Sequence, residues 1–241
     1  MKSRDSANAK PARSVRRSFA ICATPRSGST LLERLLASTG MMGEPDEYFN
    51  RANQFPALCR KYGVSFTAEL VPFLLRDKTT PNGVFGFKTH YDQFVVLRDE
   101  IDFNSTFPNL RYIYIHRRDL LGQAISYTRA TQTNQWSGDQ ELLRPPWFDP
   151  QDIESRLDAI LEQCAAWQRY FAMFEVESIE VSYEDVATAP KQTCEKIFDF
   201  CGVDATAPSN LEVAGIKRQA DQLTEEWRKR MVAHWRERER R

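Results

Sequence analysis

The feature that most constrains the fold is a short apolar run followed at once by small polar residues and a helical pattern. Phe19-Ala20-Ile21-Cys22-Ala23 is typical of a strand that is buried on both faces. Thr24-Pro25-Arg26-Ser27-Gly28-Ser29 interrupts this run. Leu31, Leu32, Leu35 and Leu36 then repeat at helical spacing until Gly40, which is typical of a helix end. The sequence therefore begins with a predicted strand, loop and helix.

The same alternation continues along the chain. Further strands are expected at residues 84–88, 111–116 and 178–183. Helical patterns occupy residues 52–62, 66–76, 120–131, 150–174, 190–201 and 223–239. Strands that alternate with helices predict an α/β fold with a central, mostly parallel sheet flanked by helices. In such sheets ligands bind at the carboxyl ends of the strands.

Length and charge set the domain organisation. A chain of 241 residues fits one α/β domain, expected at residues 19–241. Residues 1–18 hold six Lys and Arg against one Asp and predict a disordered basic tail. The whole chain balances 33 basic against 33 acidic residues, which argues against a specific nucleic-acid binder and leaves charge-based chemistry to local clusters.

Cysteine usage and hydropathy bear on location. The five cysteines show no CxxC or Cys/His ligand spacing, so reduced thiols in a cytoplasmic protein are expected. The basic start lacks the apolar stretch of a secretory signal. No run reaches the roughly 18 apolar residues of a transmembrane segment.

The loop at residues 24–30 has the chemistry of an anion site. A loop between a buried strand and a helix directs backbone N–H groups and the positive end of the helix dipole to one point. Gly28 permits close backbone approach, Ser27, Ser29 and Thr30 offer hydroxyls, and Arg26 adds a fixed charge. The GxxxxGK[ST] pattern of a Walker-type ATPase is absent. An ordinary strand-to-helix turn is the alternative interpretation.

Several motifs in order make the chain resemble the Stf0 group of bacterial carbohydrate sulfotransferases. The loop itself resembles the 5′-phosphosulfate loop of enzymes that use 3′-phosphoadenosine 5′-phosphosulfate (PAPS). It is followed by Gly43-Glu44-Pro45-Asp46-Glu47-Tyr48-Phe49, which matches a GEPxE[FY]F segment of the group. His116-Arg117-Arg118-Asp119 and Arg218-Gln219-Ala220-Asp221 extend the resemblance over residues 19–235.

The resemblance implies a P-loop-like sulfotransferase fold and a set of donor-binding residues. It places the PAPS phosphosulfate on Arg26, Ser27, Gly28, Ser29 and Thr30, with Arg26 where many sulfotransferases carry a Lys that stabilises the leaving group. The 3′-phosphate would then lie on Ser126 and on Arg117, with Arg118 as the alternative that another family spacing selects, and on Arg218. Tyr183 matches a position near the adenine.

Two residues compete for the role of general base toward the acceptor hydroxyl. Glu47 matches the catalytic glutamate of the group, and Glu44 beside it could bind sugar hydroxyls. His90 lies in Lys88-Thr89-His90, which resembles the segment that carries the catalytic histidine in cytosolic sulfotransferases, and imidazole has a suitable pKa. The Stf0 pattern has no histidine there. Lys88 could stabilise the transferring sulfuryl group or extend to solvent.

The function expected from the resemblance is sulfuryl transfer from PAPS to a carbohydrate or glycolipid hydroxyl by in-line displacement. Arginines and loop amides can neutralise the charges involved, so no metal is expected. A homodimer is a family-level expectation. The alternatives are a P-loop-like kinase that uses the loop for ATP and a non-catalytic nucleotide- or glycan-binding protein.

Overall fold

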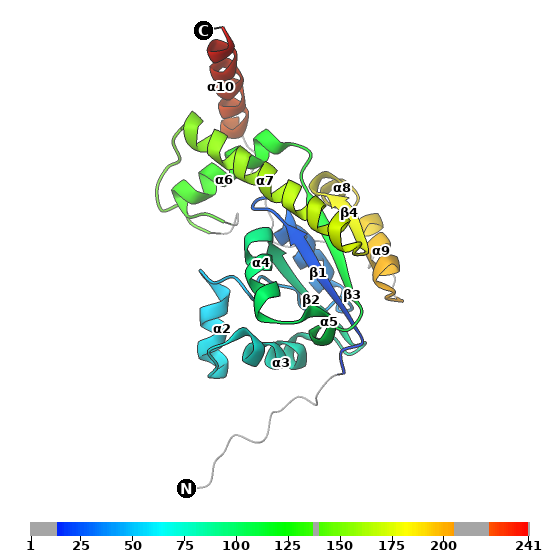
Figure 1. The fold of residues 1–241 in the computed structure, drawn as a ribbon. Helices are drawn as coiled ribbons and strands as arrows, with labels where there is room; N and C mark the ends of the chain where they lie inside the picture. Colours follow the sequence, from blue (N-terminus) through cyan, green and yellow to red (C-terminus); the bar gives the residue numbers. More distant parts are fainter. Residues whose placement is uncertain (1–13, 137–139, 205–221, 241) are drawn as a thin grey trace.

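The computed structural model describes residues 14–136, 140–204 and 222–240 (Figure 1). Its strands are β1 (Arg17–Ala23), β2 (Val84–His90), β3 (Leu110–His116) and β4 (Ser178–Ser182). They form one sheet in the order β2-β1-β3-β4, and every neighbouring pair is parallel. The predicted α/β fold with a central parallel sheet is confirmed.

Helices connect the strands and cover the sheet (Figure 1). In chain order they are α1 (Ser29–Ser38), α2 (Gln54–Tyr62), α3 (Thr67–Lys78), α4 (Tyr91–Glu100), α5 (Phe103–Thr106), α6 (Leu120–Thr133), α7 (Pro150–Phe174), α8 (Tyr183–Thr188), α9 (Pro190–Cys201) and α10 (Gln222–Glu239).

The alternation of side chains along β1 divides the core into two layers. Phe19 and Ile21 pack on one face of the sheet in a cluster with residues of α1 and α9. Ala20 and Cys22 pack on the other face with aromatic residues of β2, α4 and α7. All four side chains are fully buried, which is the environment that their continuous apolar run predicts.

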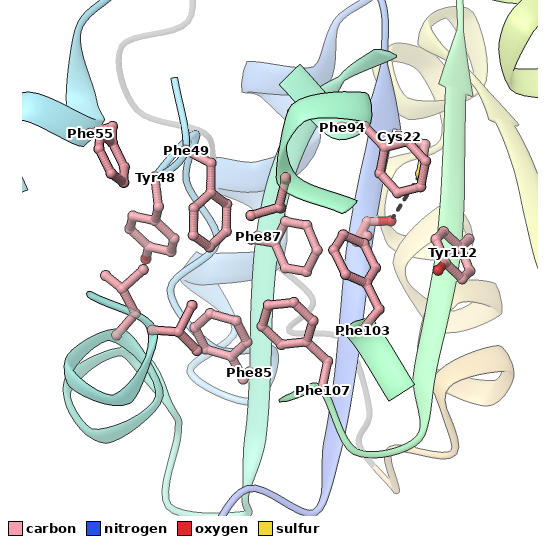
Figure 2. Packing of buried hydrophobic residues seen from close by; sticks show 14 of the residues in the cluster. Cys22, Tyr48, Phe49, Phe55, Phe85, Phe87, Phe94, Phe103, Phe107 and Tyr112 are labelled. Carbon is pink, nitrogen blue, oxygen red and sulfur yellow. Dashed lines mark hydrogen bonds between the residues drawn. The ribbon is translucent and has the colours of Figure 1, made fainter. Parts of the chain in front are cut away.

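The aromatic layer fixes the segment that precedes α2 (Figure 2). Tyr48 stacks on Phe85 with ring centroids 6.3 Å apart, and Phe49 meets Phe87 edge to face at 5.6 Å. The backbone adds a bond from Lys88 N to Asp46 O at 2.9 Å. The 44–49 segment is thereby attached to the carboxyl-terminal half of β2.

The structure departs from the sequence expectations at element boundaries and in short helices. β1 begins at Arg17 because Arg16 N and Arg17 N both donate to Gly83 O, so the strand reaches into the expected tail. Helices α4, α5 and α8 were not predicted. Helix α4 buries only Phe94 and Leu97, too few apolar positions for its period to be evident. The expected division into residues 1–18 and 19–241 stays a prediction, because residues 1–13 lie outside the described residues.

Candidate active site

Three strands deliver candidate residues to the same edge of the sheet. β1 ends at Ala23 and leads into the phosphate loop (residues 24–30), β3 ends at His116 just before Arg117, and β4 ends at Ser182 just before Tyr183. Because the strands are parallel, their carboxyl ends lie together. Trp167 of α7 donates its indole N–H to Ala23 O at 3.0 Å and secures the end of β1.

The phosphate loop has a defined geometry that depends on Gly28 and on α6. Gly28 caps α1 with φ +91°, and a Cβ there would lie 2.5 Å from Cδ2 of Tyr183, so only glycine fits. Gln123 of α6 donates its amide to Thr24 Oγ1 at 2.8 Å and to Pro25 O at 2.7 Å. Ser27 Oγ is buried and has no hydrogen-bond partner among the described residues. The loop is held in shape and presents a hydroxyl that a ligand can satisfy.

Arg26 lies at the centre of an arginine cluster formed with Arg117 and Arg129. Its Nε donates to Ser126 Oγ at 3.0 Å, and its Nη1 donates to Trp136 O. Burial, together with the charges of Arg117 and Arg129, lowers the pKa of Arg26 to about 10. The guanidinium still carries its charge at neutral pH, close to the charges of Arg117 and Arg129.

The two neighbouring arginines after β3 have different environments. Arg117 is 13% exposed and lies over the ring of Tyr183, 5.1 Å from its centroid. Its Nη2 is 3.5 Å from Asp119 Oδ2, and its Nε is buried without a hydrogen-bond partner in the described parts of the chain. Arg118 is 59% exposed and makes two 2.8 Å bonds to Asp185. Arg117 therefore contacts Tyr183, whose ring lies beside Gly28 of the phosphate loop, whereas Arg118 points to the half-exposed Asp185.

A second group of charges, the Lys88 cluster, consists of Glu33, Glu47, Lys88 and His90. Lys88 Nζ lies 2.8 Å from Glu33 Oε2, 3.3 Å from Thr30 Oγ1 and 3.5 Å from Glu47 Oε2. Burial lowers the pKa of Lys88, but Glu33 and Glu47 outweigh this effect and raise it overall. Lys88 thus connects the phosphate loop to the 44–49 segment.

Glu47 is a largely buried carboxylate that several donors hold in place. Its Oε1 accepts from Gln93 Nε2 at 2.6 Å and from Asn50 Nδ2 at 2.8 Å, and it lies 3.8 Å from His90 Nδ1. Burial raises the pKa of Glu47, but His90, Lys88 and these hydrogen bonds together hold it below its ordinary value. Glu47 is therefore ionised at neutral pH.

Burial shifts the pKa values of both His90 and Glu33 so that the neutral form of each is favoured. Burial lowers the pKa of His90, Glu47 opposes this shift, and the imidazole is neutral at neutral pH. Burial raises the pKa of Glu33 to about 7, against the opposing effect of Lys88. Glu44 is separate from this group, since its side chain is largely exposed and pairs with Lys78 at 2.6 Å.

The structure brings together most of the residues expected from the sequence, and adds others. The phosphate loop, Arg117, Ser126 and Tyr183 lie around Arg26, whereas Lys88, Glu47 and His90 form the second group. Arg218 lies outside the described residues. Glu33 and Gln93 were missed. The sequence could have indicated Glu33, because this charged residue lies on the same helical stripe as Leu32 and Leu36, which are buried.

Two further properties concern metals and membranes. Within residues 14–136, 140–204 and 222–240, no group of three or more His, Cys, Asp or Glu side chains is arranged to hold a metal ion. The helices of the same ranges include none with the length and apolar character needed to span a bilayer.

Known proteins resemble this chain over nearly its whole length. The model of the family described as Stf0 sulphotransferase matches residues 18–234. Trehalose 2-sulfotransferase of Mycobacterium tuberculosis (strain Erdman) is 26% identical, over 88% of this chain and 92% of that protein. The enzyme of the same name from Mycolicibacterium smegmatis is 27% identical, over 87% and 92%.

Solved structures show the same fold. A sulfotransferase from Alicyclobacillus acidocaldarius aligns with a TM-score of 0.52 and 13% identity, covering 91% of this chain and 92% of that one. The sulfotransferase domain from the curacin biosynthetic pathway aligns with a TM-score of 0.51 and 14% identity, covering 91% and 98%. The expected sulfotransferase fold is confirmed.

Proposed function

The chain belongs to the Stf0 sulphotransferase family and is a sulfotransferase, and we propose that it transfers the sulfuryl group of PAPS to a hydroxyl of a carbohydrate or glycolipid. Membership in this family argues against the two alternatives, a P-loop-like kinase and a non-catalytic binding protein. A sulfuryl donor follows from membership, whereas the identity of the donor as PAPS and the class of acceptor are parts of the proposal.

The observation that carries the choice of donor is the arginine cluster beside the start of α1. Arg117 and Arg129 lie close enough to Arg26 for their charges to lower its pKa, next to backbone N–H groups of the phosphate loop. Ser27 Oγ and Arg117 Nε are buried donors without hydrogen-bond partners among the described residues. A ligand with two separate anionic groups would satisfy both, which fits the 5′-phosphosulfate and 3′-phosphate of PAPS.

We assign the donor contacts accordingly. The phosphosulfate would lie on Ser27, Gly28, Ser29 and Thr30, with Arg26 stabilising the negative charge of the departing phosphate as a permanent cation. Arg117 and Ser126 would hold the 3′-phosphate, and Arg117 is favoured over Arg118 because Arg118 is already neutralised by Asp185. The ring of Tyr183 lies beside Gly28 and would face the adenine.

The acceptor class rests on the relatives named trehalose 2-sulfotransferase. Glu47 is proposed as the general base. Its Oε1 accepts two hydrogen bonds, which leaves Oε2, on the Lys88 side, as the oxygen to receive the hydroxyl proton. As the acceptor oxygen bonds to sulfur, the bond from sulfur to the donor phosphate breaks and the proton passes to Glu47.

Other expectations stay predictions. His90 remains the alternative base, because a neutral imidazole can also take a proton. Glu44 is a weaker candidate for binding sugar hydroxyls, since Lys78 occupies its carboxylate. We also expect Arg218 to contribute to the 3′-phosphate site, and we expect a cytoplasmic location and a homodimer.

Calorimetry with 3′-phosphoadenosine 5′-phosphate (PAP), followed by transfer of labelled sulfuryl from PAPS to trehalose, tests the proposal. We expect PAP to bind the wild-type protein and ADP to bind far less, and we expect Arg26→Ala to lower kcat by about 10²–10³-fold. Arg60→Ala, which removes the same charge from an exposed position of α2, is the matched control. Equal binding of ADP and PAP, or ATP-dependent phosphorylation of the acceptor, would contradict it.

A further inference from the structure

Glu33 is a buried carboxylate that the proposed reaction does not use. It lies on α1, one helical turn after Thr30 of the phosphate loop, and only 8% of the residue is exposed. Its carboxylate is 2.8 Å from Lys88 Nζ, and that side chain is itself 6% exposed. Buried ion pairs seldom stabilise a fold more than apolar residues of the same volume would, so this pair calls for another explanation.

Lys88 is shared between two carboxylates. Its Nζ lies closer to Glu33, at 2.8 Å, than to Glu47, at 3.5 Å. If Glu33 were uncharged, Glu47 would be the one of these two carboxylates that still carries a charge beside the ammonium. Lys88 would then stabilise Glu47 as an anion more strongly and lower its affinity for a proton.

The proposed reaction requires Glu47 to gain a proton. At that moment Glu47 becomes neutral, and a buried ammonium without a counter-charge would oppose the step. Glu33 remains 2.8 Å from the ammonium and keeps it neutralised whether Glu47 is charged or not. Because Glu33 neutralises Lys88, the charge of the ammonium lowers the proton affinity of Glu47 less than it otherwise would.

We propose that Glu33 is a positioning residue that holds and neutralises the Lys88 ammonium so that Glu47 can accept the proton of the acceptor hydroxyl. The inference rests on the proposed function, with Glu47 as the base. Thr30 Oγ1, which lies 3.3 Å from Lys88 Nζ, and Glu33 both come from α1, so the same helix that opens the phosphate loop also places the ammonium.

We expect kcat to depend on the protonation state of Glu33 and therefore on pH. The charged groups that act on it are Lys88 of β2 and Asp46 and Glu47 of the 44–49 segment, and His90 adjoins Glu47. Burial raises the pKa of Glu33 to about 7, whereas Glu47 stays ionised at lower pH. As pH falls through 7, Glu33 gains a proton and no longer neutralises Lys88, so kcat should fall before Glu47 itself titrates.

The test is a double-mutant cycle with Glu33→Gln, Lys88→Met and both together, measuring kcat for transfer from PAPS to trehalose. We expect Glu33→Gln to lower kcat about tenfold in the presence of Lys88 and to have less than about a twofold effect in the Lys88→Met background. The fall of kcat near pH 7 should disappear in Glu33→Gln. The affinity of Glu33→Gln for PAP should match that of the wild type, since this variant leaves the arginine cluster and the phosphate loop untouched.

Two further variants keep the test decisive. Glu33→Asp retains the charge and should recover most of kcat and the pH dependence, even if Lys88→Met does not fold. Glu195→Gln is the matched control, because it breaks an exposed pair with Lys191 on α9 and should leave kcat unchanged.

The inference and the proposed function fail in different ways. Equal losses from Glu33→Gln in both backgrounds, or a lower melting temperature with unchanged kcat, would show that Glu33 has only a structural role. A wild-type protein that neither binds PAP nor transfers sulfuryl would instead overturn the proposed function, and the role of Glu33 with it.

Discussion

The arginine cluster and the Lys88 cluster are both charged and at least partly buried, but their charges are arranged differently. In the arginine cluster, partners of Arg26 include the hydroxyl of Ser126 and the carbonyl of Trp136, and Arg117 has Asp119 no closer than 3.5 Å. In the Lys88 cluster, one ammonium lies within 3.5 Å of two carboxylates. The first cluster brings three arginines close together, whereas the second pairs its one cation with two carboxylates.

This difference matches the charges of the two proposed ligands. A nucleotide donor brings several negative charges, so a site that binds it gains from several cations that lie close together. A sugar hydroxyl brings none, so the groups that handle its proton must be neutralised by the protein itself. Substitution of Arg117 should therefore affect donor binding and substitution of Glu47 should affect turnover, whereas Arg26, which is proposed to stabilise the departing phosphate, should affect turnover as well.

The largest expected effect comes from Glu47. Glu47→Gln keeps the shape and the acceptor oxygen for Gln93 but cannot take up a proton, so kcat should fall about 10²–10⁴-fold. The affinity for PAP should remain that of the wild type. Steady-state kinetics of transfer to trehalose and calorimetry with PAP measure the two quantities.

His90→Asn provides the comparison that decides between the two bases. If Glu47 is the base, this variant should lose far less activity than Glu47→Gln, because Gln93 and Asn50 still hold the carboxylate. A loss from His90→Asn as large as that from Glu47→Gln, with PAP binding intact, would assign the proton transfer to the imidazole.

A smaller effect, confined to binding, is expected at Arg117. Removal of its charged hydrogen bonds in Arg117→Ala should cost about 1.5–3 kcal/mol, which weakens PAP about 10–100-fold. Arg118→Ala is the matched control from the adjacent position, where the guanidinium is exposed and paired with Asp185, and its PAP affinity should be unchanged. The opposite ranking of the two variants in calorimetry would place the 3′-phosphate on Arg118.

The parts of the site that follow strands could be predicted from the sequence. A buried strand has a strong signature, and the residues after it must lie at the carboxyl edge of a parallel sheet. That reasoning predicted the phosphate loop at this edge, whereas the family resemblance added Arg117 and Tyr183, which follow β3 and β4. The order of motifs along the chain added Ser126, which does contact Arg26.

The partners of Glu47 could not be predicted in the same way. Gln93 lies on α4, a helix whose apolar period is weak, and its contact with Glu47 joins residues 46 positions apart. Glu33 could have been noticed as a charge on a buried stripe, but its pairing with Lys88 depends on how α1 packs beside β2. Such contacts follow from the packing of side chains, which no local pattern encodes.

The smallest prediction concerns the cost of burying Glu33, and it can sharpen the contrast between the clusters. The pKa of this carboxyl is about 7 in the folded chain, against an ordinary value of 4.5. Between these pH values the folded chain retains a proton that the unfolded chain has released, so the stability contributed by Glu33 falls as pH rises through this window. The difference in melting temperature between wild type and Glu33→Gln should therefore decline from pH 5 to pH 7.5.

The expected decline is on the order of 2 kcal/mol, or about 4–8 °C. Glu195→Gln, which changes an exposed side chain of α9, is the control. Thermal unfolding at pH 5, 6, 7 and 7.5 provides the measurement. A constant difference would mean that Lys88 keeps Glu33 ionised throughout, and the fall of kcat near pH 7 would then need another titrating group. A decline in stability together with a rise in kcat over the same pH range would show that the ionised Glu33 destabilises the fold while it supports turnover, as a counter-ion retained for chemistry should.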